Sequence, residues 1–348
     1  MQIVFYAIAF FSYLIFRESK DYFKGVVYGL LFFSIINLGV NFLNLLSGQG
    51  YMNLIRSILS NVEANNAIRA YSRFGQLCGL SGHYSRNAYF CVIGFSVACS
   101  VILSSKSKKN GMWTILALVM VGMTMLIGKR GHFLFMCASF LVVYELMGKT
   151  LTKKMKRLLA FGFGGSIFLA ITLRIFPSVN YVFQRFIDNL NSGDISNGRI
   201  KLYEEAFSQF LSNPILGIGF GNFTLNSYDY FGYQYAGVHN DYLQWLCENG
   251  IVGFIVNLFF MIYVYRLSII EMQVLISEEN NKRTEELFLI VWSVLFQTFI
   301  ILYSFTGIPH YDREVFPIYY VACSIPHYLM NKFPNNSNKI KNRLIRFR

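Results

Sequence analysis

Long apolar runs separated by short basic stretches constrain this chain more than any other feature. Hydrophobic residues make up 54% of the 348 residues and charged residues only 14%, whereas a soluble domain carries roughly 25% charged residues. The apolar residues come in blocks rather than at the period of an amphipathic helix or strand, which indicates burial in lipid. We therefore expect an all-α fold, a polytopic transmembrane helix bundle with one large hydrophilic loop.

About nine segments are candidates for membrane-spanning helices. Several are shorter than the ~20 residues that a helix needs to cross a bilayer, so we expect their ends to extend into the flanking polar residues. The expected spans are Ile3–Phe16, Gly25–Leu46, Ala88–Leu103, Met112–Gly128, Phe133–Met147, Leu158–Phe176, Ile251–Tyr265, Leu287–Ile308 and Val315–Met330.

The basic segments predict the orientation of these spans, because Lys and Arg are concentrated in cytoplasmic loops. With nine spans, five basic segments fall on one side: Arg17–Lys24, Lys106–Lys109, Lys149–Arg157, Arg266–Arg283 and the tail Lys339–Arg348. This bias, with attraction to anionic lipid, explains the net charge of +13, so the expected partner is the bilayer and not nucleic acid.

The other side, which we expect to be extracytoplasmic, would hold four segments: Ser47–Asn87, Lys129–His132, Pro177–Gly250 and Pro309–Glu314. Met1 would then begin outside, so either N-terminal sequence is missing from this chain, which we favour, or the first segment is not a true span. The expected organisation is N-terminal transmembrane helices over 1–176, an extracytoplasmic catalytic loop over 177–250, and C-terminal transmembrane helices with a basic cytoplasmic tail over 251–348.

The long outer loop contains helical patterns of its own. Apolar residues recur every three to four positions in Arg199–Leu211, which predicts an amphipathic helix. Ser196-Asn197-Gly198 would cap its start and Asn213-Pro214 would end it. A tight turn with glycines at 217, 219 and 221 follows, and a second amphipathic stretch, Tyr242–Cys247, leads into the next span. Such helices would lie at the membrane surface over the bundle.

The turn between the fourth and fifth spans breaks the charge rule. Lys129 and Arg130 place two positive charges on the predicted outer side. Cations held there indicate an anionic ligand, because Arg binds phosphate bidentately. The alternative is a tolerated exposed charge on a hairpin, since the positive-inside rule is only a bias.

Two residues of the outer loop are further candidates. Arg199 starts the amphipathic helix, where free backbone N–H groups add to the guanidinium in attracting phosphate; the alternative is a solvated arginine. His239, followed by Asn240, would be a general base because the pKa of histidine lies near neutral pH; the alternative is a solvated histidine.

Weaker signals surround these candidates. Arg73 and Arg86, in a segment rich in glycine and tyrosine, would add to a phosphate or sugar surface, or belong to a solvated loop. The aromatic residues of Tyr228–Tyr235 would stack on sugars or form an interfacial belt. Glu248-Asn249-Gly250 is typical of a cap and turn before a span. The sequence has no P-loop, no HExxH motif and no Cys/His cluster with metal spacing, so no cofactor or metal is expected.

Taken together, these fragments resemble the O-antigen ligase/polymerase family, which includes Wzy-type polysaccharide polymerases. The resemblance rests on Ser196–Arg199, Asn213–Gly219, His239–Gln244 and Glu248–Gly253, in that order and in a membrane context. The turn Lys129-Arg130-Gly131 resembles a basic motif that precedes this loop in the family. The match covers about Lys129–Gly253, over a third of the chain, and elsewhere only the hydropathy agrees.

The resemblance implies a lipid-phosphate-sugar glycosyltransferase that needs no nucleotide sugar. It implies transfer of a glycan from undecaprenyl diphosphate to the hydroxyl of a lipid-linked repeat unit, on the outer face of the cell membrane, with a chain-length regulator as a further partner. Arg130 and Arg199 would hold the diphosphate, and His239 would activate or orient the acceptor. Lys129, Arg73, Arg86 and Asn240 would bind substrate. Family members commonly have more than nine spans.

Three other functions stay open at this point. A ligase would use the same donor and transfer the glycan to a lipid A core. A flippase for lipid-linked glycans would place charges or broken helices near mid-membrane, whereas here the spans hold few charges and the candidate residues gather on one side. A non-catalytic membrane scaffold is the last alternative.

Overall fold

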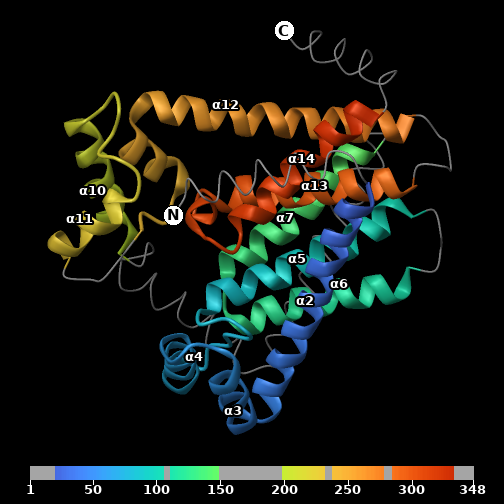
Figure 1. Ribbon diagram of the computed structural model, residues 1–348, viewed down its shortest axis with the longest axis horizontal. Helices are drawn as coiled ribbons and strands as arrows, with labels where there is room; N and C mark the ends of the chain where they lie inside the picture. The colour runs from blue at the N-terminus through green and yellow to red at the C-terminus, as the bar shows by residue number, and fades with distance from the viewer. Residues whose placement is uncertain (1–19, 106–109, 149–197, 232–236, 278–283, 333–348) are drawn as a thin grey trace.

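The computed structural model describes residues 20–105, 110–148, 198–231, 237–277 and 284–332 (Figure 1). These residues form helices joined by turns and loops, and they contain no strand. The expected spans at residues 3–16 and 158–176 lie outside the described residues. The elements are α2 (Lys20–Leu46), α3 (Gly48–Ile58), α4 (Asn61–Phe74), α5 (Tyr84–Ser104), α6 (Gly111–Ile127), α7 (Arg130–Met147), α10 (Arg199–Ser212), α11 (Asn222–Phe231), α12 (Asp241–Ser277), α13 (Thr284–Tyr303), the 3-10 turn η2 (Pro309–Tyr311) and α14 (Phe316–Lys332).

Five of the described helices are long and apolar enough to cross a membrane: α2, α5, α7, α12 and α13. Helix α6 is apolar but has only 17 residues, and α14, also 17 residues long, covers the last expected span. The prediction of a polytopic helical membrane protein is therefore confirmed.

Helices α13 and α5 form the centre of the bundle. In their most apolar windows, 83% of α13 and 78% of α5 is buried, against 22% of α12. Helix α13 packs against α5, α7, α12 and α14. Helix α12 instead exposes large apolar side chains, among them Ile255, Val256 and Phe259. A bilayer would cover such a surface, because lipid is as apolar as these side chains.

Two of the predicted span boundaries were wrong. Helix α12 continues to Ser277, so the expected cytoplasmic loop at 266–283 begins as helix. The reason is a further apolar face, in which Leu267, Ile270 and Val274 pack near Met330. Helix α13 ends at Tyr303 instead of residue 308, and the chain turns before η2.

The segment before α5 is also more ordered than the sequence suggested. It forms two helices, α3 and α4, whose N-caps are serines: the Ser47 hydroxyl accepts the N–H of Gly50, and the Ser60 hydroxyl accepts the N–H of Glu63. Ser60 with Glu63 has the spacing of a capping box, which marks a helix start. In Figure 1 these helices lie at the C-terminal end of α2, against which α3 packs.

Three buried asparagines hold the loop that follows α4. The Nδ2 groups of Asn37 and Asn41 donate to Oδ1 of Asn87 at 2.7 and 2.9 Å, and Asn87 donates to the carbonyl of Leu77 at 2.8 Å. Oδ1 of Asn37 accepts the N–H of Leu80 at 2.8 Å. Because buried amides need partners, this network joins α2 and α5 and fixes the loop that ends at the start of α5.

The glycine turn after α10 docks onto a break in α12. Gly250 has φ 63° and ψ −171°, so α12 consists of a short first part and a long second part. The N–H groups of Ile218 and Gly219 donate to the carbonyls of Cys247 and Glu248 at 3.0 and 2.9 Å. The turn and the break therefore hold α10 against the first part of α12, as Figure 1 shows at one end of the bundle.

Candidate functional site

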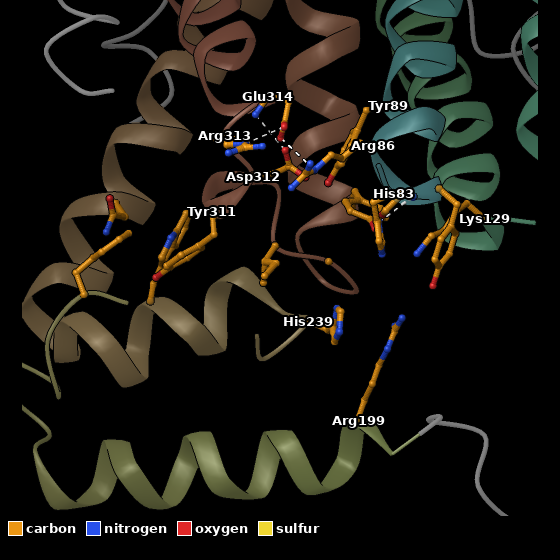
Figure 2. Close-up of a pocket in the computed structure, with 18 of the residues that line it drawn as sticks. His83, Arg86, Tyr89, Lys129, Arg199, His239, Tyr311, Asp312, Arg313 and Glu314 are labelled. Carbon is orange, nitrogen blue, oxygen red and sulfur yellow. Dashed lines mark hydrogen bonds and ion pairs between the residues drawn. The ribbon is translucent and has the colours of Figure 1, made fainter. Parts of the chain in front are cut away.

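A cavity of about 1260 Å³ opens at the end of the bundle where α10 and α11 lie. Its wall combines residues from all four segments that the sequence assigned to the outer side. The charged and histidine side chains in the wall are His83, Arg86, Lys129, Arg199, His239, Asp312, Arg313 and Glu314 (Figure 2). The four segments therefore share one end of the molecule, as predicted.

Two cations of this cavity have no acidic partner among the described residues. Lys129 precedes α7 and lies over the ring of Tyr84, with Nζ at 4.2 Å from the centroid. Arg199 starts α10, and its Nη1 donates to the carbonyl of Thr306 at 3.2 Å. In Figure 2 both side chains extend toward the space beside His239. Such a pair of uncompensated cations favours an anionic ligand.

Helix α10 begins where the sequence predicted. The N-cap residue is Gly198, the last residue of the expected cap, with φ 77°, and Ser196 and Asn197 lie outside the described residues. The helix ends before Asn213, as expected. Ala206 is buried, whereas Phe207 and Leu211 are exposed. Helix α10 therefore has exposed apolar side chains on the side that faces away from the bundle.

His239 sits in a strained backbone position between two anchored residues. Its φ of 59° makes it the one non-glycine residue with positive φ in the described part of the chain. The N–H of Val238 donates to Oε1 of Gln244 at 3.2 Å, and the N–H of Asp241 donates to the carbonyls of Ser304 and Gly307 at 2.9 and 3.1 Å. Such strain persists where the surroundings over-determine the backbone, and it often marks functional sites.

Asp241 holds this segment to the loop after α13. Its carboxylate is fully buried, and Oδ2 accepts the Ser304 hydroxyl at 2.8 Å and lies 2.7 Å from Nδ1 of His310. The ring of His310 in turn packs edge-on against Trp245 and Tyr319. The buried pair of Asp241 and His310 therefore fixes the position of His239, two residues away.

Burial and nearby positive charges lower the pKa values of two histidines and one lysine in the site. Burial, with the charges of Arg199 and Lys129, lowers the pKa of His239 to about 4. Burial and the charge of Arg199 lower the pKa of Lys129 to about 8, and the pKa of His83 falls to about 4 through burial and the charges of Lys129 and Arg86. At pH 7 a neutral His239 therefore lies beside a protonated Lys129.

On another part of the wall, two arginines and two glutamates form a closed ring of ion pairs. Arg86 contacts Glu63 at 3.4 Å and Glu314 at 3.3 Å, and Arg313 contacts the same two glutamates at 3.1 and 3.0 Å. The ring links α4, α5 and the loop before α14. Its charges balance, so the guanidinium of Arg86 is occupied by carboxylates.

The structure brings together some of the predicted site residues and separates others. Lys129, Arg199, His239 and Arg86 line the cavity. Arg130 is exposed at the first turn of α7, Arg73 is exposed in the last turn of α4, and neither lines the cavity. Oδ1 of Asn240 accepts the N–H of Leu243 at 3.0 Å and so caps α12. The functional roles of Arg130, Arg73 and Asn240 stay predictions.

Further wall residues were not singled out from the sequence. They include the carboxyls Asp312 and Glu314 and the aromatic residues Tyr84, Tyr89, Phe220, Trp245, Tyr303 and Tyr311. A signal existed for the carboxyls, because Asp312-Arg313-Glu314 is a run of charges in a short loop between two apolar segments. Among the described residues, no group of three or more His, Cys, Asp or Glu side chains has the geometry of a metal site.

Comparison with known proteins gives one family match. A family model described as O-antigen ligase matches residues 74–258, which is more than half of the chain and includes Lys129, Arg199 and His239. A comparison with curated proteins gives no match.

Proposed function

Because the chain belongs to the O-antigen ligase family, we propose that it is a membrane glycosyltransferase of polysaccharide assembly. It transfers a glycan from an undecaprenyl diphosphate carrier to a hydroxyl of a lipid-linked repeat unit. It thus polymerises an O-antigen, a capsule or an exopolysaccharide. No nucleotide sugar is needed, because the donor already carries a diphosphate as its leaving group.

One observation carries this proposal: Lys129, Arg199 and His239, far apart in the sequence, meet in one cavity. A diphosphate presents several anionic oxygens, and Arg and Lys bind these through charge-assisted hydrogen bonds. The two cations lie at the end of the bundle, where the head group of a lipid would be presented. Arg130, the residue that follows Lys129, would add to the same positive field.

Each of the three residues has a separate role in the transfer step. The acceptor oxygen bonds to the anomeric carbon while the bond from that carbon to the diphosphate oxygen breaks. Lys129 and Arg199 stabilise the negative charge that develops on the leaving diphosphate. His239 accepts the proton of the acceptor hydroxyl, and the electron pair of the broken bond leaves with the lipid diphosphate.

The pKa of His239 should change when the donor binds, in the direction that this role requires. Before the donor binds, burial and the two cations lower the pKa of His239 to about 4, so the ring is neutral at pH 7. A bound diphosphate offsets the charges of Arg199 and Lys129, and the pKa of His239 then rises toward its ordinary value. His239 becomes a stronger base when the donor is in place.

A ligase that uses a lipid A core as acceptor is the second candidate, since the matching family model is described as O-antigen ligase. The donor chemistry would be identical, and only the acceptor would differ. A flippase is less well supported, because Lys129 and Arg199 lie at one end of the bundle rather than along a central path. The proposed active face is extracytoplasmic, and a chain-length regulator would be a further partner.

The test uses a strain that lacks this protein and is complemented with variants at matched protein levels. Replacing Lys129, Arg199 or His239 singly by Ala should abolish long-chain polymer and leave single lipid-linked repeat units. Lys201→Ala is the matched control, because Lys201 is exposed on α10 two residues from Arg199 and should leave chain lengths unchanged.

An unchanged chain-length distribution in all three Ala variants would sink the proposal. The same strain separates the two candidates. A polymerase leaves single repeat units when it is absent, whereas a ligase leaves complete polymer on its lipid carrier. A host without lipopolysaccharide would exclude a lipid A core as the acceptor.

A further inference from the structure

The cavity is larger than a diphosphate alone requires. Sites for a single small molecule usually enclose roughly 300–1,000 Å³, and this cavity measures about 1260 Å³. A transferase must hold a donor and an acceptor at the same time, so the part of the cavity away from Lys129 and Arg199 has room for a second substrate.

The two parts of the cavity differ in charge. In Figure 2, Lys129 and Arg199 lie on one side of His239, and Asp312 and Tyr311 lie on the other. On the second side the arginines are neutralised within the ion-pair ring, so Asp312 adds a carboxyl that the ring does not balance. A second diphosphate would not be favoured here, because Arg86 and Arg313 are already paired with carboxylates and leave no uncompensated positive charge for it.

Aromatic rings line the same cavity as this carboxyl. The rings of Phe220 and Tyr311 stack with centroids 5.0 Å apart and planes 8° apart. Phe220 comes from the glycine turn and its side chain is 42% exposed, and both rings line the cavity. A flat, exposed aromatic surface packs against the C–H face of a pyranose, because both are apolar.

Asp312 has the hydrogen-bonding capacity that sugar hydroxyls need. One of its oxygens, Oδ1, accepts the N–H of Glu314 at 3.1 Å. Burial, with the hydrogen bond and charge of Glu314, raises the pKa of Asp312. Burial alone would also raise the pKa of Glu314, but hydrogen bonds from Asp312 and Arg313 lower it. When protonated, Asp312 both donates and accepts, as a hydroxyl partner should.

We propose that Phe220, Tyr311 and Asp312 form the subsite for the acceptor sugar. The pyranose ring packs on the exposed aromatic surface while Asp312 hydrogen-bonds its hydroxyl groups. The accepting hydroxyl then faces His239, which lies between this subsite and the cations that hold the donor. This assignment rests on the proposed function and gives the two substrates separate parts of one cavity.

The test measures equilibrium binding to the full-length protein purified in detergent, with two probes. One probe is undecaprenyl diphosphate, which has no sugar. The other is the host's own repeat-unit oligosaccharide, released from its carrier by mild acid and free of phosphate. Binding does not depend on turnover, so inactive variants can be compared with the wild type.

The variants are chosen to give opposite results with the two probes. Phe220→Ala and Asp312→Ala should each weaken oligosaccharide binding about tenfold or more and change undecaprenyl diphosphate binding less than about twofold. Arg199→Ala should do the reverse. Retained binding of the second probe shows that each variant is folded, and Lys201→Ala should change neither.

The proposal would be overturned if Phe220→Ala and Asp312→Ala left oligosaccharide binding unchanged. Equal weakening of both probes by these variants would also overturn it, because the subsite would then not be separate. Failure of the proposed function looks different. A wild-type protein that binds the oligosaccharide but not undecaprenyl diphosphate would contradict the diphosphate site and still support the sugar subsite.

Discussion

Lys129 keeps a positive charge where its surroundings disfavour one. Burial and the neighbouring Arg199 lower its pKa to about 8, so the side chain is mostly protonated at pH 7 and mostly neutral at pH 9. Raising the pH through this range removes a charge from the proposed donor site. Arg is protonated throughout the same range, so Lys129→Arg separates the titration of residue 129 from other effects of pH.

We predict that KM for the lipid-linked donor rises about tenfold between pH 7 and pH 9 in the wild type, because only the charged lysine binds the diphosphate strongly. In Lys129→Arg, KM should stay constant over this range. The measurement is a pH profile of initial rates with purified protein. An equal rise of KM in Lys129→Arg would show that another group is responsible.

We propose that Asp241 positions His239 and does not itself touch the substrates. Asp241→Asn keeps the shape of the side chain but replaces the carboxyl group that meets Ser304 and His310 with an amide. The strained segment with His239 should then relax, and misplacement by about 1 Å costs roughly 100-fold in rate. We therefore predict a fall in kcat of about that size, with binding of undecaprenyl diphosphate nearly unchanged.

Steady-state kinetics and probe binding together check this prediction. Ser304→Ala is the milder control, since it removes one hydrogen bond worth about 1 kcal/mol and leaves the pair of Asp241 and His310 intact. If Asp241→Asn lost diphosphate binding as strongly as kcat, its effect would be general damage to the fold.

The contact between the glycine turn and the break in α12 determines the position of α10 and therefore of Arg199. Gly217 and Gly250 both have positive φ. A Cβ at Gly217 would meet the backbone of Glu248, and a Cβ at Gly250 would meet the carbonyl group of Ile215. Both positions therefore need glycine for their conformation and for the close approach.

We predict that Gly217→Ala and Gly250→Ala each destabilise the protein by about 1–3 kcal/mol, the cost of a strained backbone. Gly29→Ala is the matched control. Gly29 lies in α2 with no atom near its added Cβ, so alanine there should be neutral or stabilising. Thermal unfolding in detergent measures the difference. A Gly217→Ala protein as stable as the wild type would contradict the role of this contact.

The helices of the bundle could be predicted because an apolar run of about 20 residues is long enough to span a bilayer and too apolar for a solvated loop. Helices α3 and α4 were missed because their mixed sequence resembles a solvated loop, although the capping box of Ser60 and Glu63 marks one start. The apolar continuation of α12 past residue 265 was hidden by Arg266 and the charged residues beyond it.

The candidate site could be predicted only in part. Arg199 and His239 were found through local signals, a helix start and an isolated histidine. Sequence spacing does not show whether Lys129 or Arg130 faces the cavity. Neighbouring side chains at a helix start point in directions about 100° apart, so only one of them can face it. The carboxyl side of the cavity was missed because Glu63 and Arg313 pair across 250 positions of sequence, which no local pattern reveals.

Four segments that were predicted to lie on the same side of the membrane contribute residues to one cavity. This agreement supports the orientation deduced from the basic loops, and the face of the membrane stays a prediction. Of the native cysteines, five are buried and Cys137 is partly buried, so an introduced cysteine can be labelled selectively.

We predict that a membrane-impermeant maleimide labels Lys201→Cys in intact cells. Asn331→Cys, at the exposed end of α14, should react only after the cells are permeabilised. The wild-type protein is the control for background labelling of Cys137. The opposite pattern would place the cavity on the cytoplasmic side.

The most direct test of the transferase function reconstitutes the purified protein in liposomes with lipid-linked repeat units isolated from a strain that lacks it. Chain length and released undecaprenyl diphosphate are measured together, without any nucleotide sugar. The wild type and Lys201→Ala should join repeat units and release one lipid diphosphate for each new linkage, and Arg199→Ala and His239→Ala should do neither. No chain growth by the wild type, or growth by Arg199→Ala at the wild-type rate, would contradict the proposed function.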